Sequence, residues 1–109
     1  MTLGEVWWVE FQARGGHAQA GRRPAIVVQR EKDLPTILLV PLTSQLDALR
    51  FPGTELVEPD SRNGLRKPSV ALVFQLTAVD RRYLASQIGS VSEAVLTQLW
   101  LSFDELTGR

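Results

Sequence analysis

The hydrophobic pattern of this 109-residue chain changes its period once, near residue 91. Before that point, apolar and β-branched residues gather in short runs separated by turn residues, a pattern typical of strands in a small β domain. After it, apolar residues recur every three or four positions from Ser92 to Leu106, which predicts one amphipathic helix. We therefore expect a single domain over residues 1–109 that is mainly β and ends in an α-helix.

The elements expected from this pattern can be placed along the chain. Strands are predicted over residues 4–11, 24–29, 36–42, 54–57 and 69–77, with 86–90 as a further short strand or a connector. Residues 12–21 are predicted to be a loop, Asn63-Gly64 a turn, and residues 80–84 one helical turn. Ser90 or Ser92 is expected to cap the terminal helix, and Gly108 to end it. This order favours a small barrel or sandwich over an alternating α/β fold.

The residue types exclude several chemistries. Without cysteine, the chain has no disulfide, thiolate zinc site or cysteine nucleophile. A single histidine, His17, excludes multi-histidine metal sites and two-histidine acid–base catalysis within one chain. The sequence also lacks a tight acidic cluster and a glycine-rich phosphate loop with lysine. Any enzymatic activity is therefore expected to need no metal or cofactor.

Membrane insertion and secretion are not expected. No apolar run approaches the roughly 20 residues that span a bilayer. The first residues, Met1–Glu5, lack the basic and apolar regions of a signal peptide. We expect a soluble cytoplasmic protein.

The charges are balanced in total but segregated along the chain. Its 12 basic and 12 acidic residues give a net charge of zero. Segments 1–30 and 61–90 have a basic excess, whereas 31–60 and 91–109 have an acidic excess. Two basic segments that meet in the fold would form a phosphate-binding face on a neutral protein. Charge alone favours the simpler interpretation, arginines scattered over a solvated surface.

Polar residues near the ends of the predicted strands are the candidates for a site. Arg22 and Arg23 precede the second strand, Thr43 and Ser44 follow the third, and Gln75 lies within the fifth. Each has a structural alternative. An arginine before a strand proline is commonly part of a surface ion pair, and Thr43 could simply end its strand by satisfying backbone groups.

Five short segments, in their order along the chain, resemble a known family. They are Gly4–Val9 (GEVWWV), Gly21–Val28 (GRRPAIVV), Val40–Ser44 (VPLTS), Gly64-Leu65 with Lys67–Ser69 (KPS), and Ile88-Gly89 followed by the helix. The chain resembles the MazF/PemK (Kid) family, the endoribonuclease toxins of type II toxin–antitoxin systems, from Gly4 to about Leu106. No single segment is decisive, but the ordered set is specific.

This resemblance implies a fold, an activity and partners. The fold would be a small SH3-like barrel with a C-terminal helix, usually a symmetric homodimer. The activity would be metal-independent, sequence-specific cleavage of single-stranded RNA. The ribose 2′-hydroxyl attacks the adjacent phosphate and leaves a 2′,3′-cyclic phosphate and a 5′-hydroxyl. A cognate antitoxin protein would block the groove with a disordered segment that folds on binding.

The resemblance also implies roles for individual residues. Arg23 matches the catalytic arginine, whose planar guanidinium suits the charge that develops on phosphorus, and Thr43 matches the partner hydroxyl. Arg22, Ser44 and Gln75 are the expected RNA contacts, and His17 could donate a proton or stack on a base. The general base stays open, because arginine keeps its proton in proteins and is therefore a poor base.

The chain departs from the family at Phe74, where many members have an acidic residue before the glutamine. Strand alternation places Phe74 on an apolar, core-like face, although an aromatic ring could instead stack on a base. In both cases the carboxylate is missing. Its absence leaves open either the family's usual assignment of the acid and base catalysts or the RNA sequence that the protein recognises. Trp7 and Trp8 lie in the first predicted strand and Trp100 in the terminal helix. These positions favour packing in the core or in a dimer interface over stacking on RNA bases.

Two further classes of function stay open. One is a non-catalytic toxin of the same fold that poisons DNA gyrase, as the CcdB relatives do. Those relatives end in Trp-Gly-Ile, whereas this chain ends with Leu106–Arg109, which speaks against that class. The other is an inactive module that keeps the antitoxin interface. Phe74 is its only support, and the presence of Arg23 and Thr43 counts against it.

Overall fold

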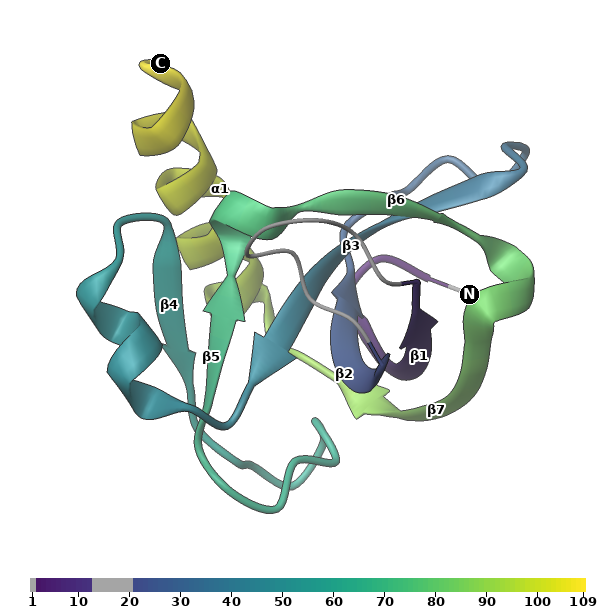
Figure 1. Cartoon of the computed structure of the whole chain (residues 1–109), viewed down its shortest axis with the longest axis horizontal. Coiled ribbons are helices and arrows are strands. Elements are labelled where there is room, and N and C mark those ends of the chain that lie inside the picture. Colours follow the sequence, from purple (N-terminus) through teal and green to yellow (C-terminus); the bar gives the residue numbers. More distant parts are fainter. Residues whose placement is uncertain (1, 13–20) are drawn as a thin grey trace.

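The computed structural model describes residues 2–12 and 21–109, so His17 lies outside the described residues. The described chain forms seven strands and a C-terminal α-helix (Figure 1). The strands are β1 (Glu5–Phe11), β2 (Gly21–Val27), β3 (Thr36–Thr43), β4 (Thr54–Val57), β5 (Ser69–Leu72), β6 (Thr77–Asp80) and β7 (Leu84–Ser90). The helix is α1 (Glu93–Thr107), and three 3-10 turns are η1 (Leu46–Arg50), η2 (Val73–Gln75) and η3 (Arg81–Tyr83). The expected mainly β fold with a C-terminal helix is confirmed.

All the strand pairs are antiparallel, and the sheet is organised around β3. The strand order is β4-β5-β3-β2-β1-β7, and β6 also pairs with β3. One edge of β3 pairs with β2, while the other edge pairs first with β6 and then, at its C-terminal end, with β5. Within the described ranges no ladder joins the outer strands β4 and β7, so closure into a barrel stays a prediction.

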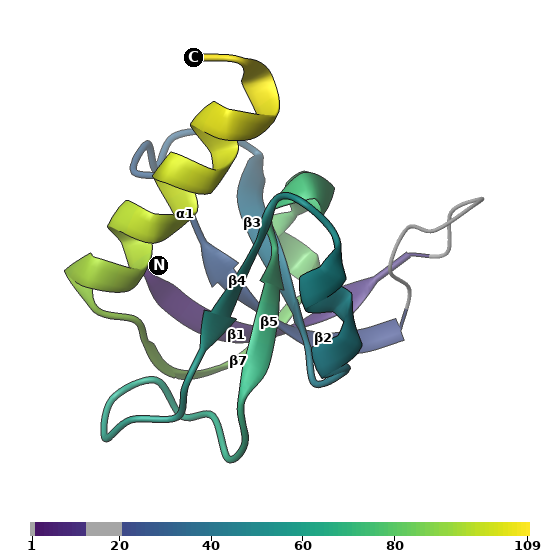
Figure 2. The ribbon, with the colours of Figure 1, turned by 90° about the vertical axis from the view of Figure 1, so that its left-hand side faces the viewer.

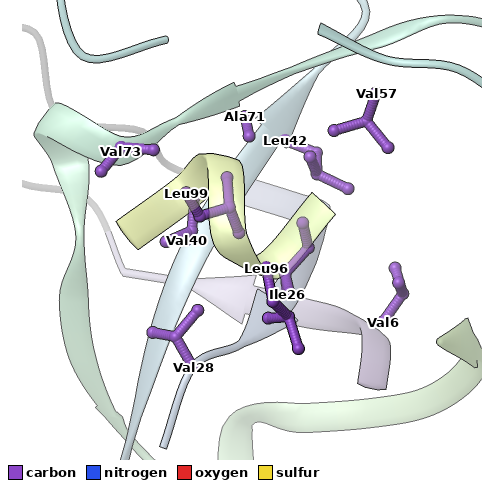
Figure 3. Close-up of a cluster of buried hydrophobic side chains, with 10 residues drawn as sticks. All are labelled: Val6, Ile26, Val28, Val40, Leu42, Val57, Ala71, Val73, Leu96 and Leu99. Atoms are coloured by element: carbon purple, nitrogen blue, oxygen red, sulfur yellow. The ribbon is translucent and has the colours of Figure 1, made fainter. Parts of the chain in front are cut away.

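Two apolar clusters cover opposite faces of the central strands. Because side chains alternate along a strand, Ile26 points into one cluster while Ala25 and Val27 point into the other. The first cluster lies under α1 (Figure 3) and contains Val6, Ile26, Val28, Val40, Leu42, Val57, Ala71, Val73, Leu96 and Leu99. The second contains Val9, Phe11, Ala25, Val27, Ile37, Leu39 and Val79, with Trp7 packed against it. The first strand is therefore covered on both faces, with Val6 in one cluster and Val9 in the other.

The terminal helix lies against one side of the sheet, as Figure 2 shows. Ser92, rather than Ser90, caps it, because the Ser92 Oγ accepts a hydrogen bond from the Val95 amide at 3.2 Å. Gly108 ends it in the left-handed conformation (φ 81°), as predicted. Leu96 and Leu99 are buried, whereas Trp100 and Leu101 are 40% and 51% exposed and do not extend the core. No helix in the described ranges is long and apolar enough to cross a membrane.

The second strand begins earlier than predicted. It starts at Gly21 rather than at Pro24, because the C-terminal end of β1 pairs with it as far as Phe11↔Gly21. The predicted strand over residues 24–29 has Pro24 at its first position, where the missing backbone N–H of proline costs the sheet no hydrogen bond. In the structure Pro24 lies within the strand opposite Trp8, and partial burial of both residues accompanies this pairing.

The predicted strand over residues 69–77 is wrong as one element. Its pairing with β3 shifts by three residues between Leu42↔Ala71 and Leu39↔Thr77, and the 3-10 turn η2 accommodates those residues. This insertion breaks the side-chain alternation on which the core placement of Phe74 depended. Phe74 is 40% exposed, and its ring lies 5.7 Å from that of Phe51, so the core interpretation is wrong.

Candidate functional site

A cleft of about 670 Å³ opens where the ends of β2 and β3 meet the β4–β5 connection. Its lining residues are Trp8, Arg22, Arg23, Pro24, Leu42, Thr43, Ser44, Gly64, Leu65, Arg66, Lys67, Ser69 and Ile88. Four of these side chains are cationic, and no carboxylate is among the lining residues of the described chain. The two basic segments of the sequence therefore do meet in the fold, and we name this cavity the cationic cleft.

Arg23 is partly buried in the cationic cleft, and its position follows from the β1–β2 ladder. It pairs with Val9, a fully buried core residue, so the base of the side chain is anchored in the sheet. The Arg23 Nε is buried and has no hydrogen-bond partner within residues 2–12 and 21–109. A buried, unpaired N–H group is costly, so an acceptor that reached this atom would relieve that cost.

Thr43 and Ser44 end β3 at the same level of the sheet. The β2–β3 register pairs Ala25 with Pro41, and two further residues along each strand bring Arg23 level with Thr43. Thr43 is buried, and its Oγ1 accepts a hydrogen bond from the Gln45 amide at 3.2 Å, so it does help to end the strand. The hydroxyl keeps its own proton to donate. Ser44 is exposed at the rim.

Arg22 lies on the other face of β2 and links two residues of β1. Its guanidinium forms an ion pair with Glu10 at 3.6 Å and lies 5.6 Å from the centroid of the Trp8 ring. Both ion-paired side chains are about half exposed, so the pair contributes orientation more than stability. Arg22 is thus held at the cleft between an acid and an aromatic ring.

The connection between β4 and β5 forms part of the wall of the cleft and is tied to β7. Both views show it projecting beyond the ends of these strands (Figures 1 and 2). Asn63, which is 1% exposed, accepts hydrogen bonds from the amides of Asp60 (3.3 Å) and Leu65 (3.0 Å) and donates one to the Glu58 carbonyl (2.8 Å). The Ser90 amide donates to the Arg62 carbonyl at 2.9 Å. These bonds hold Arg66 and Lys67 in place.

Glycine is required where this connection meets β7. A Cβ at Gly64 would overlap the Ile88 carbonyl oxygen, and one at Gly89 would lie 2.5 Å from the Asn63 carbonyl carbon. Gly64 also has a φ of 73°, which favours glycine. The two backbones therefore touch directly, and the cleft wall has a defined position relative to β1 and β7.

Gln75 lines a different cleft from the other predicted contacts. It lies in η2 and lines a second cleft of about 390 Å³, together with Glu10, Phe74, Asp80 and Tyr83 among others. The fold therefore brings together Arg22, Arg23, Thr43 and Ser44 but not Gln75. Phe74 lines the second cleft as well, so its substitution for an acid removes no side chain from the cationic cleft.

Sequence reasoning missed the cations Arg66 and Lys67 and the ring of Trp8 in the cationic cleft, and Asn63 in the connection behind it. Arg66 entered only as part of a basic segment. Lys67 entered as part of that segment and of one matching segment of the resembled family, but not as a site residue. Trp8 was expected in a core or interface, but it lines the cleft and is only partly buried, so the core interpretation is wrong for this residue. Asn63 was identified only as part of a turn. Its near-complete burial depends on contacts distant in sequence, for which no local signal exists.

The fold and the cleft together define a class of protein. It is a small antiparallel β protein in which a buried arginine donor, a threonine hydroxyl and further cations face one cavity, a set suited to binding and polarising a phosphodiester. A family model described as the PemK-like, MazF-like toxin of type II toxin–antitoxin systems matches residues 2–105. The chain belongs to this family.

Individual relatives are similar over nearly the whole chain. The endoribonuclease EndoA of Bacillus subtilis is 24% identical over 99 residues, which cover 88% of this chain and 84% of the relative. Endoribonuclease MazF9 of Mycobacterium tuberculosis is 31% identical over 107 residues, with 91% and 89% covered. The crystal structure of MazF from Deinococcus radiodurans matches with a TM-score of 0.82 and 26% identity, covering 100% of this chain and 97% of that one.

Proposed function

We propose that this protein is the toxin of a type II toxin–antitoxin system and a metal-independent endoribonuclease that cleaves single-stranded RNA at a short recognised sequence. The observation that carries the proposal is the cationic cleft, which Arg23, with its buried, unpaired Nε, lines together with Thr43. The endoribonuclease relatives support the reaction type.

The proposed reaction takes its nucleophile from the substrate. The ribose 2′-hydroxyl gives up its proton to a base while its oxygen bonds to the adjacent phosphorus, and the bond to the 5′-oxygen breaks as that oxygen takes up a proton. The products are a 2′,3′-cyclic phosphate and a 5′-hydroxyl. Arg23 donates to the non-bridging oxygens as negative charge accumulates on them, and Thr43 donates its hydroxyl proton to the same phosphate. The protein needs no nucleophile of its own, and the required 2′-hydroxyl selects RNA over DNA.

Arg22, Arg66 and Lys67 would hold the phosphates on either side of the cleaved one. Ser44 at the rim is a further hydrogen-bond donor. Affinity that rests on such contacts falls steeply with salt concentration, because binding releases the counterions of the RNA. The position of Phe74 outside the cleft argues against its being a sign of lost activity, and this favours the enzyme over the inactive binding module.

The proposed partners are a cognate antitoxin protein and a second copy of the chain. The MazE–MazF complex from Deinococcus radiodurans contains a toxin chain that matches this one with a TM-score of 0.74 and 25% identity, covering 99% of this chain and 96% of that one. A disordered antitoxin segment that folds over the cationic cleft would exclude RNA from it.

The test is cleavage of a long single-stranded RNA by the purified protein in excess EDTA, with the ends of the products mapped. We expect cuts at a recurring short sequence with 2′,3′-cyclic phosphate ends. Arg23→Ala should lower kcat/KM by about 10²–10³-fold, the usual cost of losing a donor to a developing oxyanion. Toxicity should be lost with it, while antitoxin binding stays nearly intact.

A matched control is Arg50→Ala. Arg50 is an exposed arginine outside the cleft, ion-paired with Asp47 at 2.9 Å, and its loss should leave cleavage unchanged. Thr43→Val should reduce kcat, whereas Thr43→Ser should keep much of it. Full activity of Arg23→Ala, or products with 3′-hydroxyl ends, would refute the proposed site or reaction.

A further inference from the structure

Among the described residues, Trp8 is the aromatic side chain that lines the cationic cleft, and its placement differs from that of its neighbours in β1. The neighbours Val6 and Val9 are fully buried in the two cores, on opposite faces of the strand. Between Trp8 and Val9, the register with β7 shifts. Trp8 lies two residues after Val6, so strand alternation places both side chains on the same face of β1. Trp8 is nevertheless not part of the first apolar cluster. It lines the cleft, where it is only partly buried.

The indole is also held in a polar frame. The Arg22 guanidinium lies 5.6 Å from its ring centroid and is itself ion-paired with Glu10 at 3.6 Å. Trp8 pairs with Pro24 across the β1–β2 ladder, so its backbone is fixed within the sheet rather than on a loop. A ring held in this way loses little conformational freedom when a ligand packs against it.

We infer that Trp8 is the base-stacking platform of this cleft, and that it holds an unpaired base next to the phosphate bound by Arg23. The inference rests on the proposed function and adds how the cleft binds a base of the RNA substrate. An indole beside cations is the combination that binds single-stranded nucleic acid, because every base has a π-face and every nucleotide a phosphate. Stacking on Trp8 supplies affinity for unpaired RNA and tolerates any base.

The other two tryptophans have different surroundings. Trp7 packs against the second apolar cluster, and its Nε1 donates to the Glu5 carboxylate at 2.9 Å. Trp100 is 40% exposed on α1 and does not line the cleft. Trp100 is therefore the matched control, an exposed tryptophan that RNA in the cleft does not reach.

The test uses a fluorescein-labelled, fully 2′-O-methylated single-stranded RNA, which lacks the attacking hydroxyl and cannot be cleaved. Binding is measured by anisotropy at one fixed salt concentration. Trp8→Leu removes the π-face but keeps an apolar side chain, and it should weaken Kd by about 10- to 100-fold, the range that stacking contributes. Trp8→Phe should retain most of the affinity, and Trp100→Leu all of it.

Intrinsic fluorescence provides a second readout that a merely structural role would not move. In Trp100→Phe protein, the unlabelled 2′-O-methyl RNA should quench the emission, and the additional change Trp8→Phe should abolish that quenching. Equal affinity of the Trp8→Leu and Trp8→Phe proteins would overturn the inference. So would quenching that persists without Trp8, or equal quenching by a duplex of the same sequence.

The outcomes separate this inference from the proposed function. Trp8-dependent binding without cleavage of unmodified RNA would refute the ribonuclease and leave the platform standing. Cleavage with an unchanged KM and Kd in Trp8→Leu would leave the ribonuclease standing and refute the platform.

Discussion

The hydrogen bonds of Asn63 predict a large effect of a change outside the chemistry, Asn63→Ala. The carboxamide satisfies two amides and one carbonyl of the 58–68 connection, at 2.8–3.3 Å, in a site that is 1% exposed. Each such bond contributes about 1 kcal/mol net, which sums to about 3 kcal/mol for the three. A water that enters the vacated space would recover part of this, so we expect a loss of about 2–3 kcal/mol.

Urea unfolding followed by tryptophan fluorescence measures this loss. The protein concentration must be the same for every variant, because self-association would shift the midpoint. In thermal unfolding the same loss corresponds to about 10–20 °C for a domain of this size. Ser61→Ala is the control, since Ser61 is exposed in the same connection and should change stability by less than about 0.5 kcal/mol.

The same variant should weaken substrate binding at temperatures where it stays folded. Leu65, Arg66 and Lys67 reach the cleft from this connection, so a loosened wall should raise KM more than it lowers kcat. The reasoning is refuted if Asn63→Ala unfolds within about 0.5 kcal/mol of the wild type, the range of an ordinary surface change.

Two further predictions concern packing and pH. Gly89→Ala places a Cβ 2.5 Å from the Asn63 carbonyl carbon, so it should lower the free energy of unfolding in urea by about 1–3 kcal/mol. The control is Ala85→Ser, at an exposed position of β7. An equal loss in both variants would contradict the close approach of the two backbones. Burial, together with the negative charge of Glu105, raises the pKa of the Glu55 carboxyl above its usual 4.5. The folded state therefore binds this proton more tightly than the unfolded state. As a result, the protein loses stability as the pH rises through the folded-state pKa. Glu55→Gln should therefore raise the urea midpoint at pH 7 but not below pH 4.5. A gain that persists below pH 4.5 would count against this explanation.

Much of the fold follows from local pattern. The change of period near residue 91 predicts the terminal helix, and Gly108 marks its end because only glycine enters the left-handed region readily. The strand prediction fails at residues 73–75, where the register on β3 shifts by three residues. That shift depends on which strand lies alongside, and the apolar residues of the segment carry no sign of it.

The candidate site also has features that the sequence determines and features that only the fold decides. The sequence by itself determines which groups exist: arginines before Pro24, a hydroxyl after β3, a single histidine, no thiol, and a phenylalanine at position 74. Only the tertiary structure decides which groups meet. It places Arg66 and Lys67 in one cleft with Arg23 and Gln75 in another. It also places Trp8, which was expected in the core or a dimer interface, in the cationic cleft. The physical reason is that strand pairing and backbone contacts between distant segments set these positions, whereas residue type and hydrophobic period act only over one element.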